Sequence, residues 1–185
     1  GRAGLLFLLA AWVFGARAVL YGTRKRDRKL LKLGPVYAGL AFAGIVLAVA
    51  MLQRELITRD FSLAYVQQVG SADTPPLYNF AAMWSALEGS ILLWGLTLAA
   101  FTGAVAWRFR KRSADELVGW ALVVMFVVTA FFAMLSFGPA DAFAAGAANV
   151  TSGPGPNPLL QNHILVLFHP PILYLGYVGF TVPFA

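Results

Sequence analysis

Long apolar stretches dominate the hydropathy pattern of this chain, and shorter polar segments separate them. An α-helix needs roughly 20 apolar residues to cross about 30 Å of hydrocarbon. Five stretches are close to that length, and they cover residues 4–21, 35–53, 80–107, 117–137 and 163–185. The pattern therefore predicts an all-α integral membrane protein, a polytopic helix bundle with about five transmembrane helices.

Positive charge concentrates in two of the segments between these stretches. Of the 14 Lys and Arg residues, ten lie in segments 22–34 and 108–116. Short cytoplasmic loops collect Lys and Arg, so we expect these two segments on the inner side of the membrane. The loops 54–79 and 138–162 then lie outside, together with the N-terminus. Because the outer loops are the longer ones, we expect activity to face outward. Arg17, near a helix end, is expected to reach the headgroups.

Composition supports a membrane chain and excludes several other classes. With 59% hydrophobic and 12% charged residues, a soluble domain is excluded. The net charge of +6 does not indicate nucleic-acid binding, because the basic runs lie where topology signals lie, and the lipid bilayer is the expected contact. There is no cysteine, which excludes a disulfide, a thiolate metal site and a thiol nucleophile within this chain. Since the chain starts without Met and stops in an apolar stretch, we expect it to be part of a longer protein.

One carboxylate lies inside a predicted span. Glu88 is eight residues into the stretch 80–107, where a charge is costly unless it serves a functional site. Alternatively, this long stretch overshoots the bilayer, and Glu88 lies at the outer interface one helical turn after Trp84. Trp84 and Trp94 fit either an interfacial packing role or stacking on a planar cofactor.

The two histidines, His163 and His169, lie near the start of the last stretch. Pro170 and Pro171 lack backbone N–H groups, so we expect the fifth helix to begin at the prolines with His169 as its outer cap. From there to Ala185 the helix is too short to cross, and we expect it to continue. An imidazole at that position can bind a metal or haem, act as a base, or cap the helix. The two histidines are too close in sequence to ligate one haem iron from opposite faces, and too few for a structural zinc site.

Three sequence motifs, taken together, point to a known family. They are Phe61-Ser-Leu-Ala-Tyr-Val, Trp84-Ser-Ala-Leu-Glu-Gly-Ser-Ile-Leu-Leu-Trp94, and Asn157-Pro-Leu-Leu-Gln161 followed by His169-Pro-Pro-Ile-Leu-Tyr-Leu-Gly-Tyr-Val-Gly-Phe180. The chain resembles the CcmF family of cytochrome c haem lyase subunits over nearly its whole length, and it resembles the amino-terminal third of such a protein. The family's Trp-rich outer domain, its second outer-haem histidine and the two histidines of its buried b haem would lie downstream.

The resemblance implies a function and a site. In that family the histidine before the double proline is an axial ligand of haem iron at the outer membrane face, which here is His169. The family joins b-type haem to the Cys-x-x-Cys-His thiols of apocytochrome c in the bacterial inner membrane. The implied partners are a haem chaperone, apocytochrome c and other membrane subunits of cytochrome c maturation. Trp84, Glu88 and Trp94 are further candidates for haem contact. His163 departs from the family pattern, and we expect a polar interface residue there.

Two functions of other classes also fit the sequence. A haem transporter would use polar residues and broken helices within the membrane, as Glu88 with Gly89 suggests. A structural assembly subunit would leave haem binding to a partner. Because half of the implied outer haem site and all of the buried one lie outside these 185 residues, we expect the chain alone to be inactive.

Overall fold

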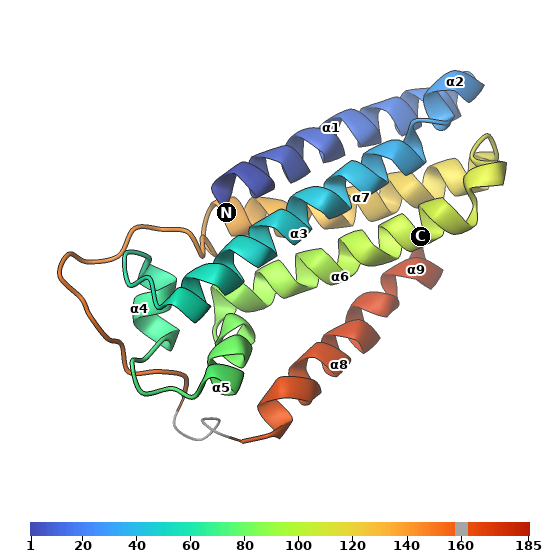
Figure 1. Cartoon of the computed structure of the whole chain (residues 1–185). Coiled ribbons are helices and arrows are strands. Elements are labelled where there is room, and N and C mark those ends of the chain that lie inside the picture. The colour runs from blue at the N-terminus through green and yellow to red at the C-terminus, as the bar shows by residue number, and fades with distance from the viewer. Residues whose placement is uncertain (158–162) are drawn as a thin grey trace.

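Four long helices pack side by side as a bundle (Figure 1). The computed structural model describes residues 1–157 and 163–185, and over these residues the chain is helical, with one isolated bridge between Leu63 and Ala145. Helix α1 contacts α3 and α7, and α6 closes the bundle by contacting the same two helices. The four helices are α1 (Arg2–Lys25), α3 (Gly34–Thr58), α6 (Leu87–Arg108) and α7 (Glu116–Phe137).

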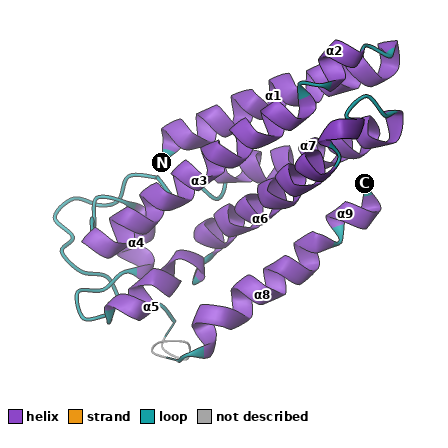
Figure 2. Ribbon diagram, turned by 45° about the vertical axis from the view of Figure 1, so that its right-hand side comes forward, coloured by secondary structure: helices purple, strands orange, loops and turns teal. Residues whose placement is uncertain are grey.

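A fifth long helix lies outside this bundle. Helix α8 (Leu165–Gly179), extended by the short α9 (Thr181–Phe184), runs along α6 on one side of the molecule (Figure 2). When α8 and α9 are counted together, five helices are long and apolar enough to cross a membrane. The prediction of an all-α polytopic membrane protein with about five transmembrane helices is confirmed.

Short elements gather at the two ends of the bundle (Figure 1). At one end Arg26 forms a 2.8 Å ion pair with Glu116, so the two basic segments 22–34 and 108–116 lie together. Two segments on one side of the membrane must lie at the same end of the bundle, as these do. That this side is the inner one stays a prediction. The basic end holds α2 (Arg28–Leu31) and the 3-10 helix η2 (Arg110–Arg112), and the opposite end holds α4 (Ala64–Val69), α5 (Pro76–Ala81) and the 3-10 helix η1 (Ala82–Trp84).

Small residues bring the backbones of α1 and α3 into contact. A Cβ atom added at Gly44 would lie 2.8 Å from the amide nitrogen of Leu8 and 2.9 Å from the carbonyl oxygen of Gly4. Lipid tails are as apolar as leucine, so helices in a membrane associate through close packing of this kind and through hydrogen bonds. The pair α1 and α3 is therefore held by contact along the backbone, which leaves no space for a side chain at Gly44.

The predicted span 80–107 is not one helix. It divides into α5, η1 and α6, with Ala86 extended between them (φ −136°, ψ 175°). At this break the Tyr65 hydroxyl shares its one proton between the carbonyl oxygens of Ala82 and Met83, at 3.0 and 2.8 Å, and the Ser85 hydroxyl and amide also donate to the Ala82 carbonyl, at 2.8 and 3.2 Å. Those carbonyls would otherwise accept bonds from a continuing helix. Glu88 therefore lies in the first turn of α6, and the expectation that it follows Trp84 by one turn of the same helix is wrong.

The fifth helix also begins earlier than expected. Helix α8 starts at Leu165 and includes both Pro170 and Pro171, so His169 lies inside it and does not cap it. The stretch Leu165–Phe184 has 20 residues, which is long enough to cross a membrane, and the expectation of a short segment starting at the prolines is wrong. Within α8 only Val178 is buried. The helix tolerates Pro170 because Trp84 donates a hydrogen bond to the carbonyl oxygen that this proline leaves without a helical donor.

Candidate functional site

His169 lies in the second turn of α8 and is exposed. Residues three and four before it and three and four after it share its side of the helix. Val166 is half-buried, and Leu165, Ile172 and Leu173 are 58%, 64% and 40% exposed. The imidazole therefore stands on an exposed helix face that is otherwise apolar. Among the described residues it forms no hydrogen bond and no ion pair, so both ring nitrogens are available to a ligand.

Two hydrogen bonds join α8 to the rest of the structure. Upstream of His169, the indole Nε1 of Trp84 donates to the carbonyl oxygen of Val166 at 2.7 Å. Downstream, the Tyr174 hydroxyl donates to Ser90 Oγ at 3.2 Å. His169 lies between these two anchors in the sequence. At about 100° of rotation per residue, His169 lies about 140° around the helix from Tyr174, and so it faces away from α6.

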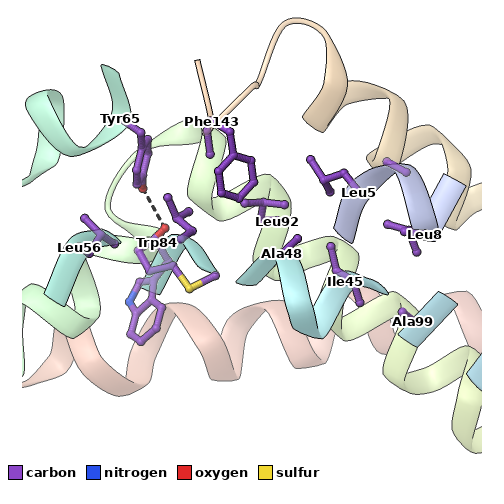
Figure 3. Close-up of a cluster of buried hydrophobic side chains, with 14 of the residues drawn as sticks. Leu5, Leu8, Ile45, Ala48, Leu56, Tyr65, Trp84, Leu92, Ala99 and Phe143 are labelled. Carbon is purple, nitrogen blue, oxygen red and sulfur yellow. Dashed lines mark hydrogen bonds between the residues drawn. The ribbon is translucent and has the colours of Figure 1, made fainter. Parts of the chain in front are cut away.

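Trp84 ends the 3-10 turn that precedes α6. Its side chain is 8% exposed and packs edge-on against Phe80, with ring centroids 5.4 Å apart. Figure 3 shows Tyr65 bonded to the same turn, while the indole extends toward α8. The Ser90 hydroxyl donates to the Trp84 carbonyl oxygen at 3.0 Å. Trp84 is thus fixed at both its backbone and its side chain.

Glu88 is half-buried at the amino-terminal end of α6, where the helix dipole favours a negative charge. Its Oε2 atom is buried and has no hydrogen-bond partner among the described residues. Burial raises the pKa of the Tyr65 phenol far above its usual range, and the nearby charge of Glu88 adds to the effect. Tyr65 therefore stays protonated and keeps its role as donor to the turn that carries Trp84.

Trp94 lies six residues after Glu88 on α6 and packs by its ring. Its centroid is 5.4 Å from that of Tyr174 on α8 and 5.4 Å from that of Phe132 on α7. Trp94 thus contacts α8 on the side that faces α6, whereas Trp84 bonds to Val166, which lies three residues before His169 and only about 60° around the helix from it. The structure brings the two tryptophans and Ser90 together with α8. Over the described residues, His169 forms no hydrogen bond with either tryptophan.

Sequence reasoning missed Tyr65, Val166, Ser90 and Tyr174 as parts of this arrangement. One signal was present for Val166, because a proline at position 170 leaves the carbonyl four residues earlier without its helical donor. The other three contacts join α8 and η1 to residues of different elements. Motif spacing along the chain does not encode such pairings.

The loops at this end of the bundle form one unit. Gln67 Nε2 donates to the carbonyl oxygens of Phe61 and Ala147, both at 2.7 Å, and the Ala147 amide donates back to Gln67 Oε1 at 3.0 Å. The loop after α3 is thereby tied to the loop after α7. A cavity of about 680 Å³ lies between them, lined by residues 59–62, Ala72 and residues 146–151.

The sequence family described as cytochrome C assembly protein matches residues 84–185. This match covers more than half of the chain and includes Trp84, Glu88, Trp94 and His169. The chain belongs to the cytochrome c assembly protein family. The resemblance drawn from the three motifs is confirmed.

Relatives within the cytochrome c assembly family extend the likeness to the whole chain. The cytochrome c-type biogenesis protein CcmF of Escherichia coli (strain K12) is 35% identical over 167 residues, covering 90% of this chain and 26% of the relative. CcmF of Pseudomonas fluorescens is 34% identical over 186 residues, covering 100% of this chain and 28% of the relative. A solved structure of the cytochrome c heme lyase CcmF superposes with a TM-score of 0.83 at 30% identity, covering 100% of this chain and 28% of that one. The chain thus spans just over a quarter of the length of these relatives.

Proposed function

We propose that this chain takes part in cytochrome c maturation by holding haem at the extracytoplasmic face of the membrane for attachment to apocytochrome c. The position of His169 is the observation that carries the proposal. Its imidazole is exposed on an apolar helix face, directly before two prolines, inside the segment that matches the cytochrome c assembly family. The names of the relatives, a cytochrome c heme lyase among them, support the reaction class.

The donor set fits haem better than a free metal ion. Over the described residues, no group of three or more His, Cys, Asp and Glu side chains could hold a metal ion. Haem iron is already held by its porphyrin nitrogens, so a few protein ligands are enough, and the imidazole of His169 would supply one of them. The exposed side chains of Leu165, Ile172 and Leu173 suit contact with the apolar face of a porphyrin.

When bound, haem supplies the vinyl groups that form thioether bonds with the two thiols of an apocytochrome Cys-x-x-Cys-His segment. The work of this chain is positioning. His169 would hold the iron from one side through a ring nitrogen. Helix α8 would keep that imidazole at a fixed height and rotation, because Trp84 and Tyr174 anchor it upstream and downstream of His169. Trp84, Glu88 and Trp94 stay candidates for haem contact within the longer protein.

We also propose the membrane, the haem type and the partners of the site. The protein lies in the bacterial inner membrane with its basic end in the cytoplasm, and the haem is b-type until it is attached. The loops joined by Gln67 are the proposed docking surface for the haem chaperone and apocytochrome c. Other membrane subunits of the maturation system complete the assembly.

Replacing His169 tests the proposal. His169→Ala in the membrane-inserted protein should lower haem at the outer site by more than about tenfold and reduce holocytochrome c formation in step. The matched control is His163→Gln, at an exposed histidine just before α8 whose Nδ1 accepts from the Leu165 amide at 3.2 Å; a Gln side-chain oxygen can keep that acceptor, so both quantities should stay unchanged. Unchanged haem content and maturation in His169→Ala, with equal membrane insertion, would refute the ligand assignment.

The same experiment separates the two rival functions. An optical haem spectrum of the purified protein that is insensitive to His169 would favour a structural subunit whose haem belongs to a partner. Uptake of haem into vesicles at wild-type rate in His169→Ala would favour a transporter.

A further inference from the structure

Helix α8 passes through two consecutive prolines without a break in its helical backbone. In an α-helix the N–H of residue 170 would donate to the carbonyl oxygen of residue 166. Pro170 has no N–H, so the carbonyl of Val166 loses its helical partner. An unpaired carbonyl in apolar surroundings is costly, and within a membrane the protein itself must supply a replacement donor.

Trp84 supplies that donor from a distant part of the chain. Its Nε1 atom lies 2.7 Å from the Val166 carbonyl oxygen, across 82 residues of sequence. An indole N–H can only donate, which matches the Val166 carbonyl that Pro170 leaves without a helical donor. Because Trp84 is 8% exposed, water does not compete freely for this bond.

The turn that presents Trp84 is itself held by hydrogen bonds. The Tyr65 hydroxyl bonds to the carbonyl oxygens of Ala82 and Met83, the two residues before Trp84, and Figure 3 shows Tyr65 pointing toward this turn. Ser90 donates to the carbonyl oxygen of Trp84 and accepts from Tyr174, so the second anchor of α8 leads back to the same tryptophan. The indole therefore approaches α8 from a fixed position.

His169 lies inside the turn that is missing its bond. The absent hydrogen bond would join residues 166 and 170, and His169 is the residue directly before Pro170. We propose that Trp84 is a positioning residue whose indole N–H replaces the backbone donor absent at Pro170 and thereby fixes the orientation of His169. This inference rests on the proposed function only in assigning haem ligation to His169.

A pair of substitutions separates the hydrogen bond from simple packing. Trp84→Phe keeps an aromatic ring and removes the donor, while Pro170→Ala restores a backbone N–H that can pair with the Val166 carbonyl. Amide hydrogen exchange of the segment 165–169 in the haem-free protein measures how often this turn opens. We expect Trp84→Phe to speed exchange about 5- to 30-fold, and to do so much less when Pro170→Ala is also present.

Haem retention and the optical spectrum of the haem give a second, independent measurement. In the haem-loaded protein, Trp84→Phe should lower haem retention about fivefold or more and alter the axial-ligand bands of the optical spectrum, and Pro170→Ala should restore both. Trp120→Phe, at an exposed tryptophan of α7, is the control and should change neither exchange nor haem. Membrane insertion is measured for every variant. If Trp84→Phe alone fails to insert, recovery of insertion on adding Pro170→Ala supports the same conclusion.

The outcomes are separable from those of the proposed function. Equal effects of Trp84→Phe with and without Pro170→Ala would show that the ring acts by packing and would overturn the inference. If His169→Ala leaves outer haem unchanged, the ligand assignment fails, while the exchange experiment still decides whether Trp84 fixes the turn.

Discussion

The four-helix bundle and helix α8 are held by different kinds of interaction. In the bundle, α1 and α3 meet along their backbones, and a Cβ atom added at Gly44 would lie within 2.9 Å of backbone atoms of α1. Along α8 only Val178 is buried, Val166 and Leu167 pack partly buried against the core, and two hydrogen bonds and an aromatic contact complete the attachment. Close packing along backbones specifies the bundle, whereas limited apolar packing and a few specific side-chain contacts hold the helix that carries His169.

Helix α8 has fewer buried residues than the bundle helices. An element with few buried apolar contacts opens at a lower free energy than the structure around it, and binding elements are commonly of this type. Because the contacts of α8 lie on both sides of His169 in the sequence, they can restrain the rotation of the helix while leaving its outer face free. The comparison predicts that substitutions in the bundle affect folding, and that substitutions at the anchors affect the site.

The largest effect should come from filling the contact between α1 and α3. Gly44→Leu forces two backbones apart, and we expect it to lower the free energy of unfolding by about 3 kcal/mol or more, with loss of inserted protein. Thermal unfolding in detergent and the amount of protein in the membrane measure this. Gly39→Leu is the control on the same helix, since a Cβ atom there would meet nothing within 4 Å. Equal loss in both variants would contradict the packing account.

A smaller effect is expected at the turn between α5 and α6. Tyr65→Phe leaves the carbonyl oxygen of Met83 without its donor, while that of Ala82 still accepts from Ser85, and the variant should lower the free energy of unfolding by about 1–3 kcal/mol. Tyr21→Phe, at an exposed tyrosine of α1, should cost almost nothing. Local hydrogen exchange should place the loss at 82–90, while the contact between α1 and α3 stays protected.

The pH dependence of the Tyr65 effect has a definite sign. Burial raises the pKa of Tyr65 in the folded protein above its unfolded value. Its stabilisation is therefore complete below the unfolded pKa of about 10, and is lost only as pH rises through the folded pKa. The difference in stability between wild type and Tyr65→Phe should thus be constant from about pH 6 to 9. A difference that disappears within that range would show that another group titrates at this turn.

The sequence predicts the features that depend on local composition. Apolar length identifies the five membrane-crossing helices, and the two runs of Lys and Arg lie at one end of the bundle, as their positions suggested. Both errors concern places where a distant side chain decides the backbone. The stretch 80–107 breaks where the Tyr65 hydroxyl bonds to the carbonyl oxygens of Ala82 and Met83. Helix α8 continues through Pro170 because the Trp84 indole replaces the missing backbone donor.

At the candidate site, too, local motifs predict some features and distant contacts decide the others. His169 was identified by its motif, and the cytochrome c assembly family match includes it. Its place within α8 was not predicted, because proline statistics alone favour a helix start at Pro170. Trp84 was a candidate for haem stacking, and the structure adds a hydrogen bond across 82 residues that no local pattern contains.

The smallest effect should come from the downstream anchor of α8. Tyr174→Phe removes the hydroxyl that donates to Ser90 and keeps the ring beside Trp94, so we expect a loss of about 0.5–1 kcal/mol in the attachment of α8. Hydrogen exchange along 172–179 should rise severalfold, while exchange in α1 and α3 does not change. Tyr177→Phe is the matched control, because Tyr177 lies on the same helix and is 61% exposed. If the two variants exchange alike, the hydroxyl of Tyr174 does not anchor α8, and the restraint on His169 rests on Trp84 alone.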